Sequence, residues 1–345
     1  MDKKIAVLGT GAIGSPIGGL LTRAGHDVVL IDQWAAHVEA MKAHGLRITI
    51  GPRENPESDL VVPVRAYHLC EVCTLHQQFD IVFLTCKSYD TRWMAQFIEP
   101  YLKPDGVLVS VQNSLNDEWI VPIVGYDRDI GCVLTGGGEL LEPGHVWRDR
   151  SLEHHYYTLG ELHGKVTPRL EEIVRILSDA GKTRLTTNIW GAKWSKLVNN
   201  SMISALGTLA GKRPWELIDA PNFLAICVRL GKEAVQVGVA LDYNMETVLG
   251  LTAEDMLNAP EEVTVNSIRA ASSGANRGAI NMITYDIRNG RPTEVGGYLN
   301  GLVVRKGVQA GVPTPMNDVI PALILRMERG ELRPDVSNLN LVKLP

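Results

Sequence analysis

The sequence predicts an α/β protein, with a doubly wound parallel sheet followed by an all-helical domain. Three observations support this fold class. The chain begins with an apolar run, a glycine-rich turn and a helical pattern. Apolar runs typical of strands then alternate with helical patterns to about residue 187, and from residue 188 the sequence shows long helical patterns with few strand signals. We therefore expect two domains, over residues 1–187 and 188–345.

The first element is a glycine-rich turn between a buried strand and a helix. Residues 5–8 are apolar, and G-x-G-x-x-G follows at Gly9, Gly11 and Gly14. In this pattern the first glycine makes a tight turn, the second lets backbone approach a pyrophosphate, and the third brings helix and strand together. We expect the backbone of Ala12 and Ile13 at the helix start to offer N–H groups to that diphosphate.

A second strand over residues 27–31 ends at Asp32, about 20 residues after the glycines. An acidic residue there can accept hydrogen bonds from both hydroxyls of an adenosine ribose. Together these features predict a Rossmann-type dinucleotide-binding domain, against the alternative of an ordinary doubly wound domain with a glycine turn and no ligand.

The next elements continue the sheet. We expect a helix over 33–44, one or two strands within 46–66 broken at 51–58, and strands over 79–86, 106–111 and 129–134. Residues 147–159 are expected to complete the sheet, and 168–180 to form its last helix. Lys87 and Asn113 follow two of these strands, where ligands of such sheets bind. Lys87 is expected to face the cofactor, with a surface lysine as the alternative, and Asn113 to bridge nicotinamide ribose and substrate.

Composition excludes several classes of protein. The formal charge of −5 argues against a nucleic-acid surface, and no apolar run approaches the ~18 residues of a membrane span. No signal segment precedes Lys4, so we expect a cytoplasmic protein. The five cysteines are scattered along the chain and odd in number, which is typical of reduced thiols in a reducing compartment. His68, Cys70, Cys73 and His76 could suggest zinc, but no second ligand pair follows at finger spacing, and we expect no metal.

A polar row marks the first helix of the second domain, over residues 190–211. Lys196, Asn200 and Ser204 follow one another at intervals of four, which places them on one face. The apolar residues Leu197, Ile203, Leu206 and Leu209 are expected to be buried. Burying such a polar row against an apolar core costs free energy, whereas the same row can bind a substrate. The alternative is that this face of the helix is simply exposed to solvent.

A nicotinamide enzyme that reduces a carbonyl needs a proton donor at the oxygen that receives charge during hydride transfer. All nine histidines lie at or before His163, so the second domain contains none. The donor therefore comes from the first domain or is a residue other than histidine, and Lys196 is a candidate of the second kind. Glu294, in RPTEVGG, is a second candidate for a residue of the active site. Taken alone, its position is typical of an acidic residue in the first turn of a helix, where its charge complements the helix dipole.

These residues carry a resemblance. The segments GTGAIG, CKSYDT, QNS, WSKLVNNSMISALGTLAG and RPTEVGGYLNG, in this order over residues 4–320, resemble the ketopantoate reductase (2-dehydropantoate 2-reductase) family. The resemblance implies a C-terminal domain of the 6-phosphogluconate-dehydrogenase type and hydride transfer from NAD(P)H to a 2-oxo acid. It also implies Lys196 as general acid, Glu294 as a partner of the lysine or the substrate, and Asn113 and Asn200 as ligands of substrate and ribose.

Two departures bear on substrate and cofactor. Ser204 replaces the usual second asparagine, and Met282 replaces the usual serine that holds the substrate carboxylate, which favours a more apolar 2-oxo acid. The resemblance implies NADPH, whereas Asp32 and the lack of an arginine after the second strand favour NADH.

Two other functions stay open: an opine-type dehydrogenase, which would ordinarily use a histidine that the second domain lacks, and a non-catalytic nicotinamide-binding regulator. The apolar helical faces of the last 130 residues suit either a homodimer or one large core.

Overall fold

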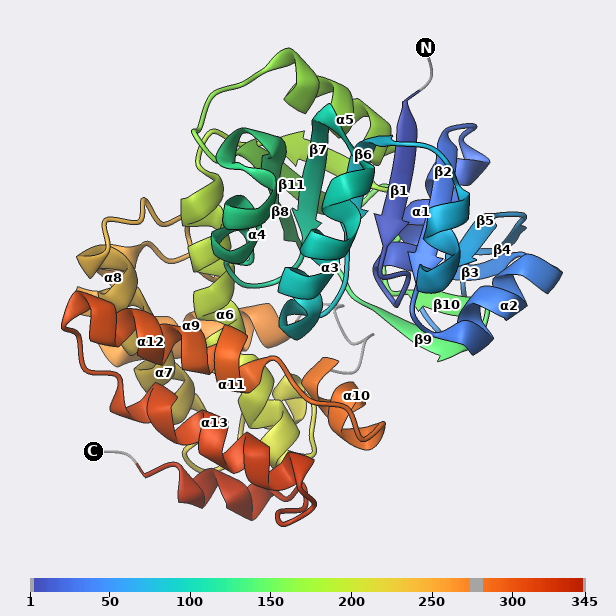
Figure 1. The fold of residues 1–345 in the computed structure, drawn as a ribbon. Helices are drawn as coiled ribbons and strands as arrows, with labels where there is room; N and C mark the ends of the chain where they lie inside the picture. The colour runs from blue at the N-terminus through green and yellow to red at the C-terminus, as the bar shows by residue number, and fades with distance from the viewer. Residues whose placement is uncertain (1–2, 274–281, 344–345) are drawn as a thin grey trace. The chain divides into compact units, whose positions relative to one another are not determined.

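The computed structural model describes residues 3–273 and 282–343. It divides into two compact units, residues 1–189 and 190–345, which are taken in turn. Figure 1 shows the strands gathered in the N-terminal unit and helices making up the C-terminal one.

An eight-stranded sheet organises the first unit, in the order β12-β11-β8-β7-β6-β1-β2-β5. Its strands are β1 (Lys4–Leu8), β2 (Asp27–Asp32), β5 (Arg65–His68), β6 (Phe79–Leu84), β7 (Leu102–Val111), β8 (Asp129–Leu134), β11 (His155–Glu161) and β12 (Lys182–Leu185). Pairing is parallel from β5 through β8, and β11 runs antiparallel to β8. Chain order reverses between β1 and β6, where ligands of doubly wound sheets bind. The predicted Rossmann-type fold is confirmed.

Helices cover both faces of this sheet. Residues of α1 (Gly14–Arg23), α2 (Ala35–His44) and α5 (Pro168–Ser178) share one apolar cluster with Val7. Residues of α3 (Thr91–Ile98) and α4 (Asp117–Val124) share another with Leu8. Adjacent residues of β1 thus enter opposite cores, as alternation along a strand requires.

A second, four-stranded sheet was not foreseen. It has the order β4-β3-β10-β9, formed by β3 (Leu46–Ile50), β4 (Ser58–Val62), β9 (Gly138–Glu142) and β10 (His145–Arg148). The expectation that residues 147–159 complete the main sheet was therefore wrong in part, because residues 145–148 pair in parallel with β3. An apolar run indicates a strand but does not specify its partner.

The second unit is helical, as predicted. Its helices are α6 (Ile189–Ala210, beginning one residue before the unit), α7 (Phe223–Ala240), α8 (Ala253–Asn258), α9 (Glu261–Ser273), α10 (Met282–Arg288), α11 (Val295–Tyr298), α12 (Asn300–Ala310) and α13 (Pro315–Glu328). Within the described part of this unit, pairing of β type is limited to one bridge between Val248 and Leu251. None of the described helices has the length and hydropathy needed to cross a bilayer.

Candidate functional site

The glycine turn has the shape of a phosphate cradle. Gly9 has φ +90°, and a Cβ there would lie 2.8 Å from the backbone nitrogen of Cys86, while a Cβ on Gly14 would overlap the Thr85 hydroxyl. A Cβ on Gly11 would meet no atom within 4 Å. Gly9 and Gly14 therefore allow the packing of β1, α1 and β6, whereas Gly11 borders open space, as close approach of a pyrophosphate requires. The turn fits a dinucleotide.

Thr85 joins the ends of the two strands at the point where chain order reverses. Its backbone N–H donates to the Leu8 carbonyl at 2.9 Å, and its hydroxyl donates to the Gly9 carbonyl at 2.7 Å. This holds the Gly9 turn against the end of β6, a role of Thr85 that was not predicted from the sequence.

Asp32 lies at the carboxyl end of β2, with 8% of its surface exposed. The Trp34 backbone N–H donates to Oδ1 at 2.8 Å, and the Thr10 hydroxyl donates to Oδ2 at 3.2 Å. The carboxylate is thus oriented by two donors, and each oxygen keeps acceptor capacity.

His37, fully buried on α2, supports the same corner and was not predicted. The Gly144 backbone N–H donates to Nδ1 at 2.9 Å, and Nε2 lies 3.2 Å from the Ser15 hydroxyl. Because Nδ1 is an acceptor, the neutral ring carries its proton on Nε2. Burial lowers the pKa of His37, against the opposing charge of Asp32, so the neutral form is favoured.

Lys87 and Asn113 lie on two loops that are tied together. Lys87 precedes a short 3-10 turn (Ser88–Asp90), and Asn113 follows β7. The Asn116 amide donates to the Asn113 carbonyl at 2.6 Å and to the Ser88 hydroxyl at 3.0 Å. Ser114 has φ +74°, an uncommon backbone conformation for a residue other than glycine. Asn116 thus braces both loops, a role that was not predicted from the sequence.

The predicted polar row lies on a well-defined stripe of α6. This 22-residue helix is buried except at Trp190, Lys196, Asn199, Asn200, Ile203 and Ser204, which are half-buried. From Lys196 on, these positions follow the spacing i, i+3, i+4, i+7, i+8 of a single helix face. The expectation that Ile203 is buried with the apolar residues was wrong, because its position falls on this same face.

Segments carrying the other predicted residues pack against α6. Asn300 follows Glu294 by six residues, and its side chain donates to the Ser201 carbonyl of α6 at 3.0 Å. Glu294 itself is half-buried at the start of α11. Farther along, the Thr208 and Thr284 hydroxyls are 2.9 Å apart, which ties α10 and its first residue, Met282, to α6. Convergence of the Lys196 and Glu294 side chains themselves stays a prediction.

A buried carboxylate braces this arrangement. Glu233 on α7 accepts hydrogen bonds from the backbone N–H groups of Met316 and Asn317, both at 2.9 Å, at the start of α13. The Asn300 amide donates to the Asn317 side-chain oxygen at 2.9 Å as well as to Ser201. Three helices are thereby linked to the middle of α6 by polar contacts.

The cysteine and histidine cluster takes a local structural role. His68 caps a 3-10 helix (Leu69–Thr74), with its Nδ1 3.1 Å from the Cys70 sulfur and its Nε2 2.8 Å from the Gln33 carbonyl. Across the described residues, no three His, Cys, Asp or Glu side chains are grouped to hold a metal ion.

Comparison with known families agrees with this architecture. Residues 5–164 match the family described as ketopantoate reductase PanE/ApbA. Residues 188–328 match the C-terminal domain of the same family.

Individual relatives match over nearly their whole length. The 2-dehydropantoate 2-reductase of Pyrococcus horikoshii is 30% identical, with 94% of this chain and 97% of the relative covered. The structure of a PanE/ApbA family ketopantoate reductase from Ralstonia eutropha is 26% identical, with a TM-score of 0.77, and the match covers 95% of this chain and 99% of that structure. D-mandelate dehydrogenase, solved with NADH and anilino(oxo)acetate, shares the fold at 23% identity, with a TM-score of 0.79 and 95% and 99% covered.

Proposed function

The chain belongs to the ketopantoate reductase family, and from this premise we propose that it reduces the keto group of ketopantoate or a more apolar 2-oxo acid. The observation that carries the proposal is the half-buried stripe of α6, on which Lys196, Asn200 and Ser204 lie together with Asn199 and Ile203, while most of the helix is buried. A bound reduced nicotinamide would supply the hydride.

Lys196 is proposed as the general acid. A lysine ammonium can give a proton to the keto oxygen and stabilise the negative charge that develops there, an effect worth several kcal/mol in a site closed to water. Glu294 would orient the lysine or hold a substrate hydroxyl. Asn200 and Ser204 would bind substrate from the same helix face, and Asn113 would bind substrate and ribose.

We propose NADH as the preferred cofactor, held by Gly9, Gly11, Ala12, Ile13, Gly14, Asp32, Lys87 and Asn113. Support comes from the Asp32 carboxylate, which two donors orient at the end of β2. A carboxylate there suits ribose hydroxyls and repels a 2′-phosphate. The family resemblance points instead to NADPH, which Lys87 could help to bind.

The deciding experiment is a panel of 2-oxo acids with NADH and NADPH, run on wild type, Lys196→Met and Lys343→Met. We expect Lys196→Met to lower kcat by about 10²–10⁴-fold, because a general acid contributes that much. The dissociation constant of NADH, measured by fluorescence, should stay within about twofold, since the change removes an interaction with the keto oxygen.

Lys343→Met removes an exposed lysine near the end of the chain and should leave both quantities unchanged. Full turnover by Lys196→Met would refute the acid assignment. Oxidation of NADH that requires an added amino acid or ammonium would favour the opine-type alternative. Cofactor binding without turnover on any 2-oxo acid would favour the regulator.

We also propose a homodimer. Val308 on α12 is 80% exposed and Leu325 on α13 is 42% exposed, so apolar side chains are available on these helices. The mass of the protein in solution, from light scattering, would reveal a monomer if this is wrong.

A further inference from the structure

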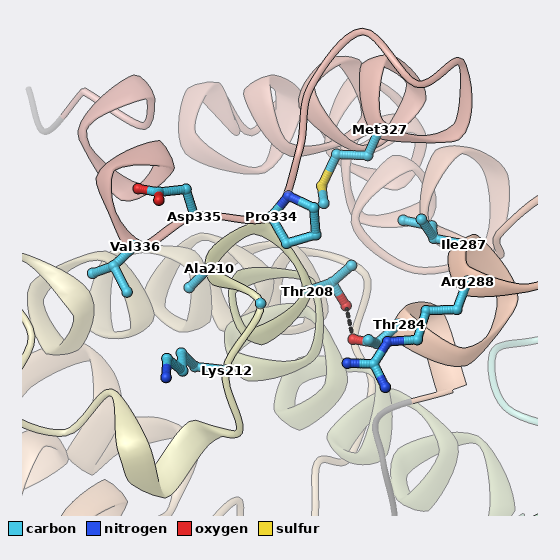
Figure 2. Close-up of a pocket in the computed structure, with 11 residues that line it drawn as sticks. Thr208, Ala210, Lys212, Thr284, Ile287, Arg288, Met327, Pro334, Asp335 and Val336 are labelled. Atoms are coloured by element: carbon cyan, nitrogen blue, oxygen red, sulfur yellow. Dashed lines mark hydrogen bonds between the residues drawn. The ribbon is translucent and has the colours of Figure 1, made fainter.

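The helical unit contains a cavity of about 250 Å³ at the C-terminal end of α6. Its walls come from three parts of the unit: the end of α6 with Lys212, the α10 residues Thr284, Ile287 and Arg288, and the segment from Met327 to Val336. Figure 2 shows the Thr208 and Thr284 hydroxyls facing each other, with Arg288 beside Thr284 and Met327 and Pro334 across the cavity.

The charges around this cavity favour an anion. Lys212 and Arg288 line it and are exposed, and neither forms an ion pair with any residue that the structure describes. The one lining carboxylate, Asp335, already accepts hydrogen bonds at Oδ1 from the Ser337 backbone N–H, at 2.8 Å, and from its hydroxyl. Two cations against one carboxylate leave a net positive charge.

The remaining walls are largely apolar. Ala210, Ile287, Met327, Pro334 and Val336 contribute hydrocarbon, while Thr208 and Thr284 are engaged with each other. A volume of 250 Å³ lies just below the ~300 Å³ at which pockets for drug-sized ligands begin. The cavity thus suits a small molecule with an anionic end and a short hydrocarbon body.

The position of the cavity separates it from the proposed reaction. Thr208 follows Lys196 by twelve residues on one helix, which corresponds to about 18 Å along the axis. A small 2-oxo acid whose keto group lies at Lys196 and whose far end meets Ser204 stops about one helical turn, ~6 Å, before Thr208. The ligand of this cavity is therefore a second molecule.

We propose that this cavity is a binding site for a short aliphatic carboxylate. The Arg288 guanidinium would pair with the carboxylate, because its planar donors match the two oxygens. The hydrocarbon chain would lie against Ile287, Met327 and Val336, and Lys212 would add positive potential from the other side of the cavity. The separation of this cavity from the reacting 2-oxo acid rests on the proposed role of Lys196, whereas its charge and volume do not.

The test uses hexanoate as the probe, measured by calorimetry and by ligand-observed NMR on the full chain without cofactor. Acetate keeps the charge without the hydrocarbon, and 1-hexanol keeps the hydrocarbon without the charge. We expect hexanoate to bind at least about tenfold more tightly than either, since a charge-assisted hydrogen bond and the buried chain both contribute.

Two variants locate the probe. Arg288→Gln should weaken hexanoate binding about tenfold, because it removes the charged partner from an exposed position. Val336→Trp should abolish binding by filling the cavity, with an unchanged circular dichroism spectrum showing that the protein is folded.

Lys196→Met serves as the matched control and should leave hexanoate binding unchanged. Loss of binding in Lys196→Met with retention in Arg288→Gln would instead place the probe in the proposed substrate site. Equal binding of hexanoate and hexanol, or unchanged binding in Val336→Trp, would overturn the proposal. Because the readout is binding, failure here does not depend on the proposed reductase activity.

Discussion

Asp32 is the side chain on which the proposed preference for NADH rests. Two donors fix its carboxylate at the end of β2, where an adenosine ribose lies in dinucleotide-binding sheets. Orientation by neighbours lowers the entropic cost of binding, because the acceptor is already in place.

We expect Asp32→Ala to weaken NADH binding at least about tenfold, because hydrogen bonds to a charged group contribute ~1.5–3 kcal/mol. NADPH binding should improve or stay constant, because the repulsion of a 2′-phosphate is removed. Fluorescence titration with both cofactors measures the ratio. Asp242→Ala, an exposed aspartate in the second unit, is the control. A parallel loss for both cofactors would show that Asp32 does not select between them.

At the scale of elements, Gly11 and Gly14 of the glycine turn have different structural roles. The space at Gly11 is open, whereas at Gly14 a side chain would collide with Thr85 and with the Gly9 carbonyl. A methyl group at these two positions should therefore have separable effects on folding and on binding.

Gly11→Ala should fold with a Tm close to that of wild type and lose the stabilisation that NADH provides. For wild type this amounts to about 2.7 kcal/mol when NADH is at 100 times its dissociation constant. Gly14→Ala should have a lower Tm even without cofactor, because the added Cβ overlaps backbone. Thermal unfolding with and without NADH separates the two. Normal NADH stabilisation of Gly11→Ala would show that no phosphate approaches this turn.

Helix α6 illustrates what spacing can and cannot predict. The interval of four residues correctly placed Lys196, Asn200 and Ser204 on one face. Its supports at Ser201 and Thr208 come from Asn300 and Thr284, residues about 76 to 99 positions away in sequence. No local pattern marks those partners.

For the molecule as a whole, His37 links the pH to the free energy of unfolding. Its folded-state pKa lies below the ordinary 6.5, chiefly through burial. As the pH falls below 6.5, the unfolded chain therefore binds the proton first, and stability is lost. Protonation would also place a proton on Nδ1, against the Gly144 N–H.

We expect the wild-type Tm to fall between pH 7.5 and pH 5.5, and His37→Gln to show a smaller fall, because glutamine offers a donor and an acceptor without titrating in this range. His44→Gln, an exposed histidine on the same helix, is the matched control. Identical pH profiles for His37→Gln and wild type would exclude this linkage.

The sequence by itself determined the Rossmann-type unit, the helical second unit, the glycine turn and the polar face of α6, because each depends on residues close together in the chain. Only the tertiary structure decided that β10 joins β3 in a second sheet, that Gly144 orients His37, and that Asn300 braces α6. The physical reason is that hydrophobic spacing specifies which side of an element is buried. The partner that buries it, and the donors that satisfy its polar atoms, come from distant segments through packing.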